Sequence, residues 1–557
     1  MILKTASYYI SSKKTYVLVI AIFITYISYV ISLFTWCKGY YTYEDLLGPL
    51  SKSFIIALSL GFFLLLSLTY FLVTRNDGGL KVVSLLVLLL VISSVYILPD
   101  IADSYYDQNF YDAGGHMARG AFVTLTGHSD PNIDRYFDLQ PAFFWFTAMF
   151  INIVYGTPTS PSDPIFSFLI KWFHVIASTL YILTLYLFFR KHGLENTGEV
   201  FLALSLFFVL NLNRFHYSAQ AYAYMLFWFL LSILPDVVRN GEVRKNFTLL
   251  PVLTVAVFVH QGIVIFMIMT LLSALVFLLS SKRWRGDLLN ILMLFTYLLF
   301  IWFLYLLYIS EFTLSNFIST IINIINRGLA ERPTGIIQTA LWRAWQPWEY
   351  VVKVKAAYMI ISILTVITLT IWMYKITMNE SYKFRAFIIL GILSSLVPIT
   401  LALGGAGYTE RVHIAILPFT ALILVETAKL PKQYRILKKV IVLSITCLII
   451  IAPVVFFSGR NFQSIPTSED KSMEFLMAHV QSVMRLYSEV SVRSAFTPFL
   501  TNSTPTRDTI YFLHSHEFIQ IMYYVTGDIT ILDSYAYRLK LTCSTIYFNP
   551  TAQFLQC

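Results

Sequence analysis

The sequence predicts an all-α polytopic membrane protein of about 13 transmembrane helices, followed by a small C-terminal extracytoplasmic α/β domain. Of the 557 residues, 57% are hydrophobic and only 13% are charged, whereas soluble proteins carry about a quarter charged residues. Apolar runs of roughly 20 residues, the length that crosses the hydrocarbon core, recur between short charged links. The apolar surface of such a chain must face lipid.

The apolar runs define the expected spans. We place them near 15–36, 53–73, 80–97, 164–189, 197–213, 217–235, 247–262, 263–280, 288–311, 356–377, 383–404, 411–428 and 438–457. The first run is too long for a signal-peptide core and has no small-residue cleavage site, so we expect an uncleaved first helix.

The net charge of +10 follows the membrane topology. Basic residues gather in short links such as Lys282 to Arg285 and Lys429 to Lys439. With the N-terminus in the cytoplasm, the cytoplasmic links hold about twice as many Lys and Arg as the longer external connections, which is the orientation that the positive-inside rule favours. The charge therefore indicates an integral protein of the plasma membrane and no nucleic-acid partner.

The apolar segment 141–156 is too short for a span, and a crossing there would place Arg190 and Lys191 outside. We expect it to lie on the outer membrane surface. The resulting organisation has six parts: N-terminal transmembrane helices 1–97, a first extracytoplasmic loop 98–163, a transmembrane core 164–311, an extracytoplasmic loop 312–355, C-terminal transmembrane helices 356–457 and an extracytoplasmic α/β domain 458–557.

Residue patterns in the tail predict mixed structure. Segments 508–513 and 529–532 are typical of strands, and 516–526 is typical of a helix. A further helix is expected to begin near Thr467 and run toward about residue 490. Cys543 and Cys557 both fall in this domain, and the sequence does not decide whether they form a disulfide.

The first external loop carries an unusual polar pattern. Helical spacing places Asp112, His116 and Arg119 on one face. An Asp beside apolar aromatic residues at the membrane edge is partly desolvated, which raises its proton affinity and suits a general base. His116 is then placed to orient or share that proton. A solvated loop with an ordinary i,i+4 pair would give the same pattern.

The order of features in this loop resembles the first external loop of the GT-C glycosyltransferases. Asp112 and His116 are followed by Gly127 in a Thr-Gly-His turn, then by Tyr136-Phe-Asp-Leu-Gln-Pro141 and an aromatic helix. Protein O-mannosyltransferases and lipid A aminoarabinose transferases belong to this superfamily. The family often has two prolines where this chain has Gln140-Pro141, and two extra spans precede the loop here. The resemblance implies that Asp112 is the catalytic aspartate and that Tyr136 belongs to the substrate site.

Further candidates lie at the expected outer ends of spans. Arg214, His216 and Gln220 stand in the link that corresponds to the second external loop of GT-C enzymes, and they are expected to bind sugar or phosphate. This link carries no acid, which argues against a two-carboxylate metal site. Anchoring of the interface is the alternative role for the Arg and the His.

Three more residues complete the set of candidates. His260 stands where two spans meet, and ionisable groups at membrane depth are costly unless they face a cavity. Arg411 begins a span after a Gly-rich turn, and guanidinium binds phosphate bidentately. Arg343 lies among Trp residues of the second large loop. The ordinary alternatives are a satisfied buried His, an ion pair between Arg411 and Glu410, and an interfacial Trp belt.

The resemblance and the external site together imply a donor that arrives in the bilayer. Nucleotide sugars are cytoplasmic, and the cytoplasmic links contain no Gly-rich phosphate loop. We therefore expect a polyprenyl-phosphate sugar as donor, a protein, lipid or glycan acceptor, and no obligatory cofactor, although a divalent metal is compatible. A polysaccharide polymerase or ligase that uses lipid-diphosphate glycans, and a transporter or flippase, are the alternatives.

Overall fold

A computed structural model gives the architecture of the chain. The structure describes residues 80–93, 110–129, 136–158, 163–211, 217–240, 243–281, 288–310, 348–395 and 408–429, shorter pieces between them, and strand residues of the C-terminal tail. The expected first span at 15–36, apart from residue 27, lies outside the described residues, and only parts of those at 53–73 and 438–457 are described.

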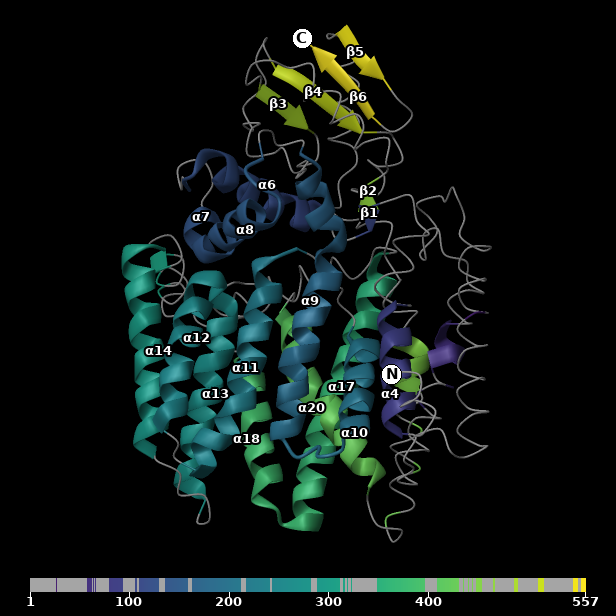
Figure 1. Cartoon of the computed structure of the whole chain (residues 1–557), viewed down its shortest axis with the longest axis vertical. Coiled ribbons are helices and arrows are strands. Elements are labelled where there is room, and N and C mark those ends of the chain that lie inside the picture. The colour runs from purple at the N-terminus through teal and green to yellow at the C-terminus, as the bar shows by residue number, and fades with distance from the viewer. Residues whose placement is uncertain are drawn as a thin grey trace, which may run out of the picture.

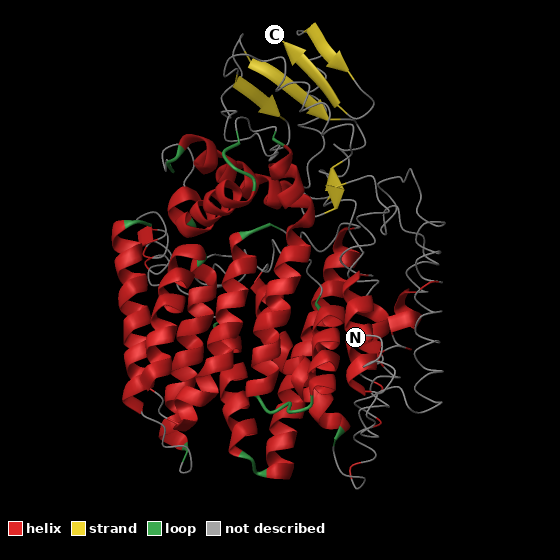
Figure 2. Ribbon diagram, viewed as in Figure 1, coloured by secondary structure: helices red, strands yellow, loops and turns green. Residues whose placement is uncertain are grey.

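A bundle of apolar helices forms the body of the molecule (Figure 1 and Figure 2). Its helices are α4 (Leu80–Ile92), α9 (Pro164–Lys191), α10 (Thr197–Leu210), α11 (Ala219–Asn240), α12 (Val243–Val259), α13 (Gln261–Ser280), α14 (Leu288–Tyr308), α17 (Trp348–Thr377), α18 (Glu380–Ser394) and α20 (Tyr408–Ala428). Each overlaps an expected span, although the bounds differ by up to ten residues at one end. Among the described residues, 5 helices are long and apolar enough to cross a membrane. The chain is a helical membrane protein.

Charged residues join the helices at one end of the bundle. Asn196 and Asn379 cap α10 and α18 there, each accepting a backbone N–H at 2.9 Å. Lys191 pairs with Asp236 at 2.7 Å, and Lys429 pairs with Glu199 at 2.5 Å. These links are the ones that the sequence assigns to the cytoplasm.

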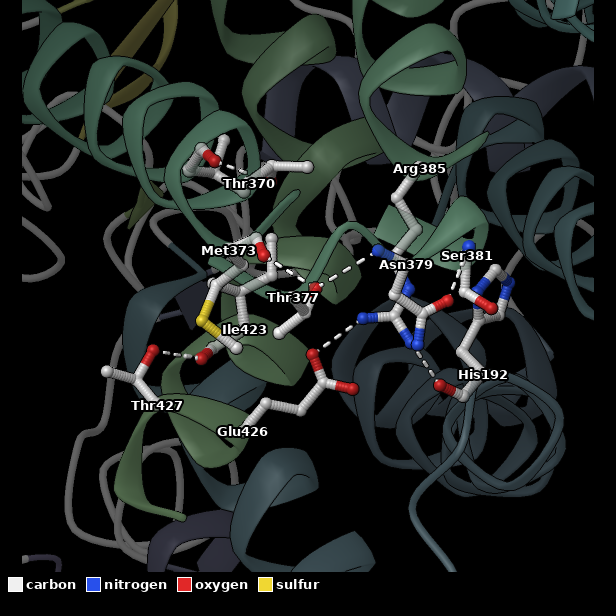
Figure 3. A network of polar contacts seen from close by, with 11 residues as sticks. His192, Thr370, Met373, Thr377, Asn379, Ser381, Arg385, Ile423, Glu426 and Thr427 are labelled. Atoms are coloured by element: carbon white, nitrogen blue, oxygen red, sulfur yellow. Dashed lines mark hydrogen bonds and ion pairs between the residues drawn. The ribbon is translucent and has the colours of Figure 1, made fainter. Parts of the chain in front are cut away.

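The most buried of these ion pairs involves Arg385 of α18 (Figure 3). Its guanidinium donates to Glu426 of α20 at 2.6 Å and to the backbone carbonyl of His192, which follows α9. It also lies 4.8 Å from the ring centroid of Tyr382. The ion pair is nearly inaccessible to water. Together, these contacts of Arg385 join α18 to α20 and to the end of α9.

Three helices cover the other end of the bundle: α6 (Phe110–Thr126), α7 (Tyr136–Leu139) and α8 (Pro141–Val154) (Figure 1). One side of α8 is buried through Phe143, Phe144 and Ile151. Its other side exposes Asn152 and six large apolar residues, namely Trp145, Phe146, Met149, Phe150, Ile153 and Val154. A helix that is largely apolar on both sides suits a position between α6 and the membrane surface.

The C-terminal tail contains a four-stranded sheet of order β3-β4-β6-β5. Its strands are β3 (Arg485–Ser488), β4 (Thr509–His514), β5 (Ser544–Phe548) and β6 (Ala552–Gln556), with β3 and β4 parallel and the other pairs antiparallel. The strand expected at 508–513 is confirmed as β4. The helix expected to run toward residue 490 is wrong at its end, because β3 occupies 485–488.

The other elements expected in the tail, the helix 516–526 and the strand 529–532, lie outside the described residues, as do Cys543 and Cys557. A short antiparallel bridge joins the tail to the first external loop. Tyr106 of β1 (Tyr106–Asp107) faces Ile465 of β2 (Ser464–Ile465). This pairing was not expected from the sequence, and it fixes the chain just before α6.

Candidate active site at the covered end of the bundle

The helix α6 carries the residues that the sequence placed on one face. Asp112 lies in its first turn, with His116 and Arg119 one and two turns further on. The side chain of Asp112 is outside the described residues. His116 and Arg119 are 5% and 9% exposed. The helical spacing is therefore confirmed, whereas the assignment of Asp112 as a base remains a prediction.

His116 lies against an aromatic cluster of α8. Its ring meets Phe143 edge-on at 5.6 Å between centroids and lies 6.2 Å from Phe144. These contacts pack the imidazole between α6 and α8 and so fix the rotation of α6 over the bundle. A His held in this way is suited to orienting a neighbour on its own helix rather than to meeting substrate in water.

Close approach of α6 and α8 depends on Gly120. A Cβ at that position would stand 2.8 Å from Cγ2 of Thr147 and 3.3 Å from the Tyr217 hydroxyl. Thr147 and Tyr217 also hydrogen-bond to each other. The small residue therefore allows α6 to settle onto α8 and onto the segment that leads into α11.

Asp138 connects this covering layer to the bundle. Its backbone carbonyl accepts a hydrogen bond from the Tyr305 hydroxyl of α14. Burial raises the pKa of the Asp138 carboxyl above its ordinary value. In the sequence, Asp138 stands out only as part of the Tyr136–Pro141 motif. Its position shortly before a proline that starts a helix was the one feature that pointed to it individually.

The junction of α12 and α13 brings two polar side chains to the same end. His260 separates the two helices in an extended conformation and is 8% exposed, as expected for a residue where two spans meet. Gln261 is the first residue of α13. Its amide nitrogen is buried and has no hydrogen-bond partner in the described part of the chain.

Arg411 of α20 approaches this junction across Gly262. A Cβ on Gly262 would stand 3.0 Å from Cε1 of His260, 3.3 Å from its Nδ1 and 3.6 Å from Nη1 of Arg411. The imidazole and the guanidinium thus border the same small space at the N-terminus of α13. Partial positive charge at a helix N-terminus adds to that of the guanidinium, so the arrangement favours an anion.

Two residues of α11 hold the backbone of Arg411. The Tyr224 hydroxyl donates to the Arg411 carbonyl at 2.9 Å, and Gln220 donates to the Tyr224 hydroxyl at 3.2 Å. The amide nitrogen of Gln220 is bonded to Tyr224, and its expected role in binding sugar or phosphate stays a prediction. Tyr224 was not a candidate, and only its spacing of four residues from Gln220 pointed to it.

The polar contacts beneath the covering helices form two groups. Asp138 is bonded to Tyr305, and Gln220 and Tyr224 hold Arg411, which borders the same space as His260. The structure brings together the predicted residues His260, Arg411 and Gln220 at the end of the bundle that α6 covers. Arg214, His216 and Arg343 lie outside the described residues, and of Tyr136 only the backbone position, the start of α7, is described.

No group of His, Cys, Asp and Glu residues in the described part of the chain is arranged to hold a metal ion. The groups here that are suited to an anion are the guanidinium, the imidazole and the start of α13.

Comparisons with known proteins found similar solved structures. No family model matches the chain, and no curated protein matches it. Crystal structures of the oligosaccharyltransferase of Archaeoglobus fulgidus are similar at low identity. With a tethered acceptor peptide, the TM-score is 0.40 at 11% identity, covering 72% of this chain and 57% of that one. With the apo form, the TM-score is 0.41 at 11% identity, covering 72% of this chain and 58% of that one.

A third crystal structure of that enzyme, with zinc and sulfate, gives a TM-score of 0.43 at 9% identity and covers 86% of this chain and 73% of that one. In the first two comparisons, the chain spans less than three-fifths of the length of the archaeal protein. A likeness at this level carries no information on activity, which depends on the residues of this chain.

Proposed function

We propose that the protein is a membrane glycosyltransferase of the GT-C type, which transfers a sugar from a polyprenyl-phosphate donor to an acceptor at the outer membrane face. The observation that carries the proposal is the convergence of Arg411 and His260 on the start of α13, at the end of the bundle that α6 covers. This convergence supports a site for an anion at the level where a lipid-borne phosphate lies.

The donor phosphate is assigned to this site. Arg411 offers two parallel N–H groups to phosphate oxygens, and charge-assisted hydrogen bonds of this kind are among the strongest in proteins. The first backbone N–H groups of α13 supply further positive potential, and the His260 imidazole borders the same space. The apolar exposed side of α8 and the surrounding helices leave the isoprenoid chain in the hydrocarbon region.

In the proposed reaction, Asp112 is the general base. Its carboxylate takes the proton from a hydroxyl or amine nucleophile of the acceptor as that atom forms a bond to the anomeric carbon. The bond between this carbon and the phosphate oxygen breaks, and its electron pair leaves with the lipid phosphate. Arg411 stabilises the charge that develops on that oxygen. No step requires a metal, because a lipid monophosphate is already a workable leaving group.

The position of the ion pairs supports this proposal over a transporter. Transporters typically carry charged pairs or broken helices near mid-bilayer. In the described ranges, the ion pairs gather at the end opposite α6. This end is tied by Arg385 and Glu426, whereas the other end is covered by separate helices.

A donor panel tests the proposal. Purified protein in lipid is incubated with radiolabelled polyprenyl-phosphate hexoses and pentoses, and release of label from the lipid phase is followed. Lipid-diphosphate oligosaccharides and water-soluble nucleotide sugars serve as comparisons. We expect release from at least one lipid monophosphate sugar and none from nucleotide sugars. Turnover of only the diphosphate oligosaccharides would instead support a polymerase or ligase.

A further inference from the structure

Three polar side chains lie buried where α17 packs against α20. Tyr358 and Ser362 come from α17 and are 3% and 0% exposed, and His413 comes from α20 and is 0% exposed. The rings of Tyr358 and His413 lie 6.1 Å apart between centroids at an angle of 66°. In the part of the chain that the structure describes, the two hydroxyls and both imidazole nitrogens have no hydrogen-bond partner.

The helix geometry gathers these groups on one interface. Tyr358 and Ser362 are four residues apart, so they share the side of α17 that faces α20. His413 follows Arg411 by two residues, a rotation of about 200° around the helix. Its side chain therefore leaves α20 on the side opposite to Arg411, and the cluster is separate from the phosphate site.

Unsatisfied polar groups of this density call for a ligand. Nearly all buried polar groups in folded proteins have a partner, and an ordered water or other small molecule is a common partner when the protein supplies none. Ionisable residues within membrane helices are costly and generally mark a functional site. Single orphan atoms occur elsewhere in the described residues, but here four are contributed by three side chains of one helix interface, two of which, Tyr358 and His413, are in ring contact.

The chemistry of the three side chains defines the ligand class. Both hydroxyls can donate and accept, and a neutral imidazole has one donor and one acceptor nitrogen. The two ring nitrogens point away from each other, so one small atom partners only one of them. A partner for that nitrogen and the two hydroxyls must both donate and accept. We propose that Tyr358, Ser362 and His413 form an intramembrane site for a single hydroxyl group, supplied either by water or by a lipid alcohol.

The depth of the cluster fits such a ligand. Tyr358 is the second residue of the span-length apolar segment of α17, Ala357–Thr377, and His413 is the sixth residue of α20. Both helices enter the bilayer from the outer face in the expected topology. The site therefore lies in the outer part of the bilayer, within reach of interfacial water and of the polar end of a long-chain alcohol.

The sign of a stability change tests whether the site is filled. Tyr358→Phe removes one hydroxyl and little volume. If a hydroxyl ligand is bound, this variant lowers the Tm of the protein in lipid, because the ligand loses a partner. If the site is empty, the variant leaves the Tm unchanged or raises it, because an unsatisfied buried hydroxyl disappears. Either of these last results overturns the proposal.

Thr370→Val is the matched control on the same helix. The Thr370 hydroxyl is buried but donates to the Val366 carbonyl at 2.7 Å. Its replacement reports what loss of an ordinary satisfied hydroxyl does to the Tm. Ser362→Ala combined with Tyr358→Phe should lower the Tm further than Tyr358→Phe alone when the ligand is present.

A spectroscopic measurement separates the two sources of the hydroxyl. The protein is labelled with ¹⁵N-histidine for NMR, and the signals of His413 are identified as those missing from the spectrum of the His413→Gln variant. Magnetisation transfer from water to these ring nitrogens in delipidated protein identifies water. Absence of this transfer, with a Tm that falls on delipidation and recovers on addition of polyprenol in the wild type but not in Tyr358→Phe, identifies a lipid alcohol. If neither result is obtained, the site has no ligand and the assignment is refuted.

Discussion

Gly262→Ala tests the space that Arg411 and His260 share. The added Cβ would stand 3.0 Å from Cε1 of His260 and 3.6 Å from Nη1 of Arg411. The imidazole must then move by a few tenths of an ångström. Such overpacking costs about 1–3 kcal/mol, whereas alanine in a helix gains about 0.5–1 kcal/mol over glycine. We therefore expect a modest loss of stability.

Donor binding should respond more strongly than stability. If the displaced imidazole and guanidinium hold the donor phosphate, a loss of about 1.4 kcal/mol of binding weakens the donor tenfold. The assay measures the KM for the lipid-phosphate donor and for the acceptor in the same preparation, with Tm as the check on folding. We expect the donor KM to rise about tenfold and the acceptor KM to stay within a factor of about two.

His260→Ala provides the control for this prediction. In that background the Cβ added at position 262 has no imidazole to displace, so Gly262→Ala should lose most of its effect on the donor KM. An effect of the same size in both backgrounds would show that the glycine acts through another contact. No change in the donor KM in the wild-type background would remove this space from the phosphate site.

Three further outcomes are expected. Arg411→Ala should raise the donor KM by about 10–100-fold, because a hydrogen bond to a charged group contributes about 1.5–3 kcal/mol; equal effects on donor and acceptor would contradict this. Burial raises the pKa of Asp138 in the folded protein, so its stabilising contribution is present below the unfolded-state pKa and is lost as the pH rises through the folded-state pKa. The Tm of Asp138→Asn minus the Tm of the wild type should therefore increase from acid to neutral pH, and a difference that does not change with pH would refute this prediction. Arg385→Ala should cost about 3–5 kcal/mol of unfolding free energy because it leaves Glu426 buried without its cation, while the donor KM of the folded protein is unchanged.

The bundle could be predicted from the sequence because each span is a continuous apolar run with polar ends. Asn196 and Asn379 mark two helix starts through side-chain caps that their residue type favours. The place of 141–156 across one end of the bundle, and not among its long helices, followed from its length and from the basic pair at 190–191. These properties depend on residues that are close in the sequence, so they do not require knowledge of contacts between distant segments.

The tail was harder to predict because its strands take their stability from partners elsewhere in the chain. Strand β3 pairs with β4, and β1 pairs with β2 from a distant segment. Short segments with such pairing carry little local pattern, so a helix was expected where β3 occurs. Tertiary context overrides propensity in segments of this length.

The candidate site divides in the same way. Asp112, His116 and Arg119 were grouped correctly because they share one helix. The approach of Arg411 to His260 depends on how α20 packs against α13 and on the absence of a side chain at Gly262. The contact between Asp138 and Tyr305 likewise joins two helices that are distant in the sequence. Pairings of this kind follow from packing, which a single sequence does not encode locally.

The most direct test of the proposed enzyme is sugar release by Asp112→Asn. The variant keeps the size of the side chain but cannot take up the acceptor proton. Asp163→Asn, at the start of α9 where the side chain makes no capping hydrogen bond, is the matched external control. The proposed mechanism predicts loss of at least about a hundredfold in transfer rate, the range of general-base catalysis, with normal folding and donor binding. Wild-type transfer by Asp112→Asn would contradict it.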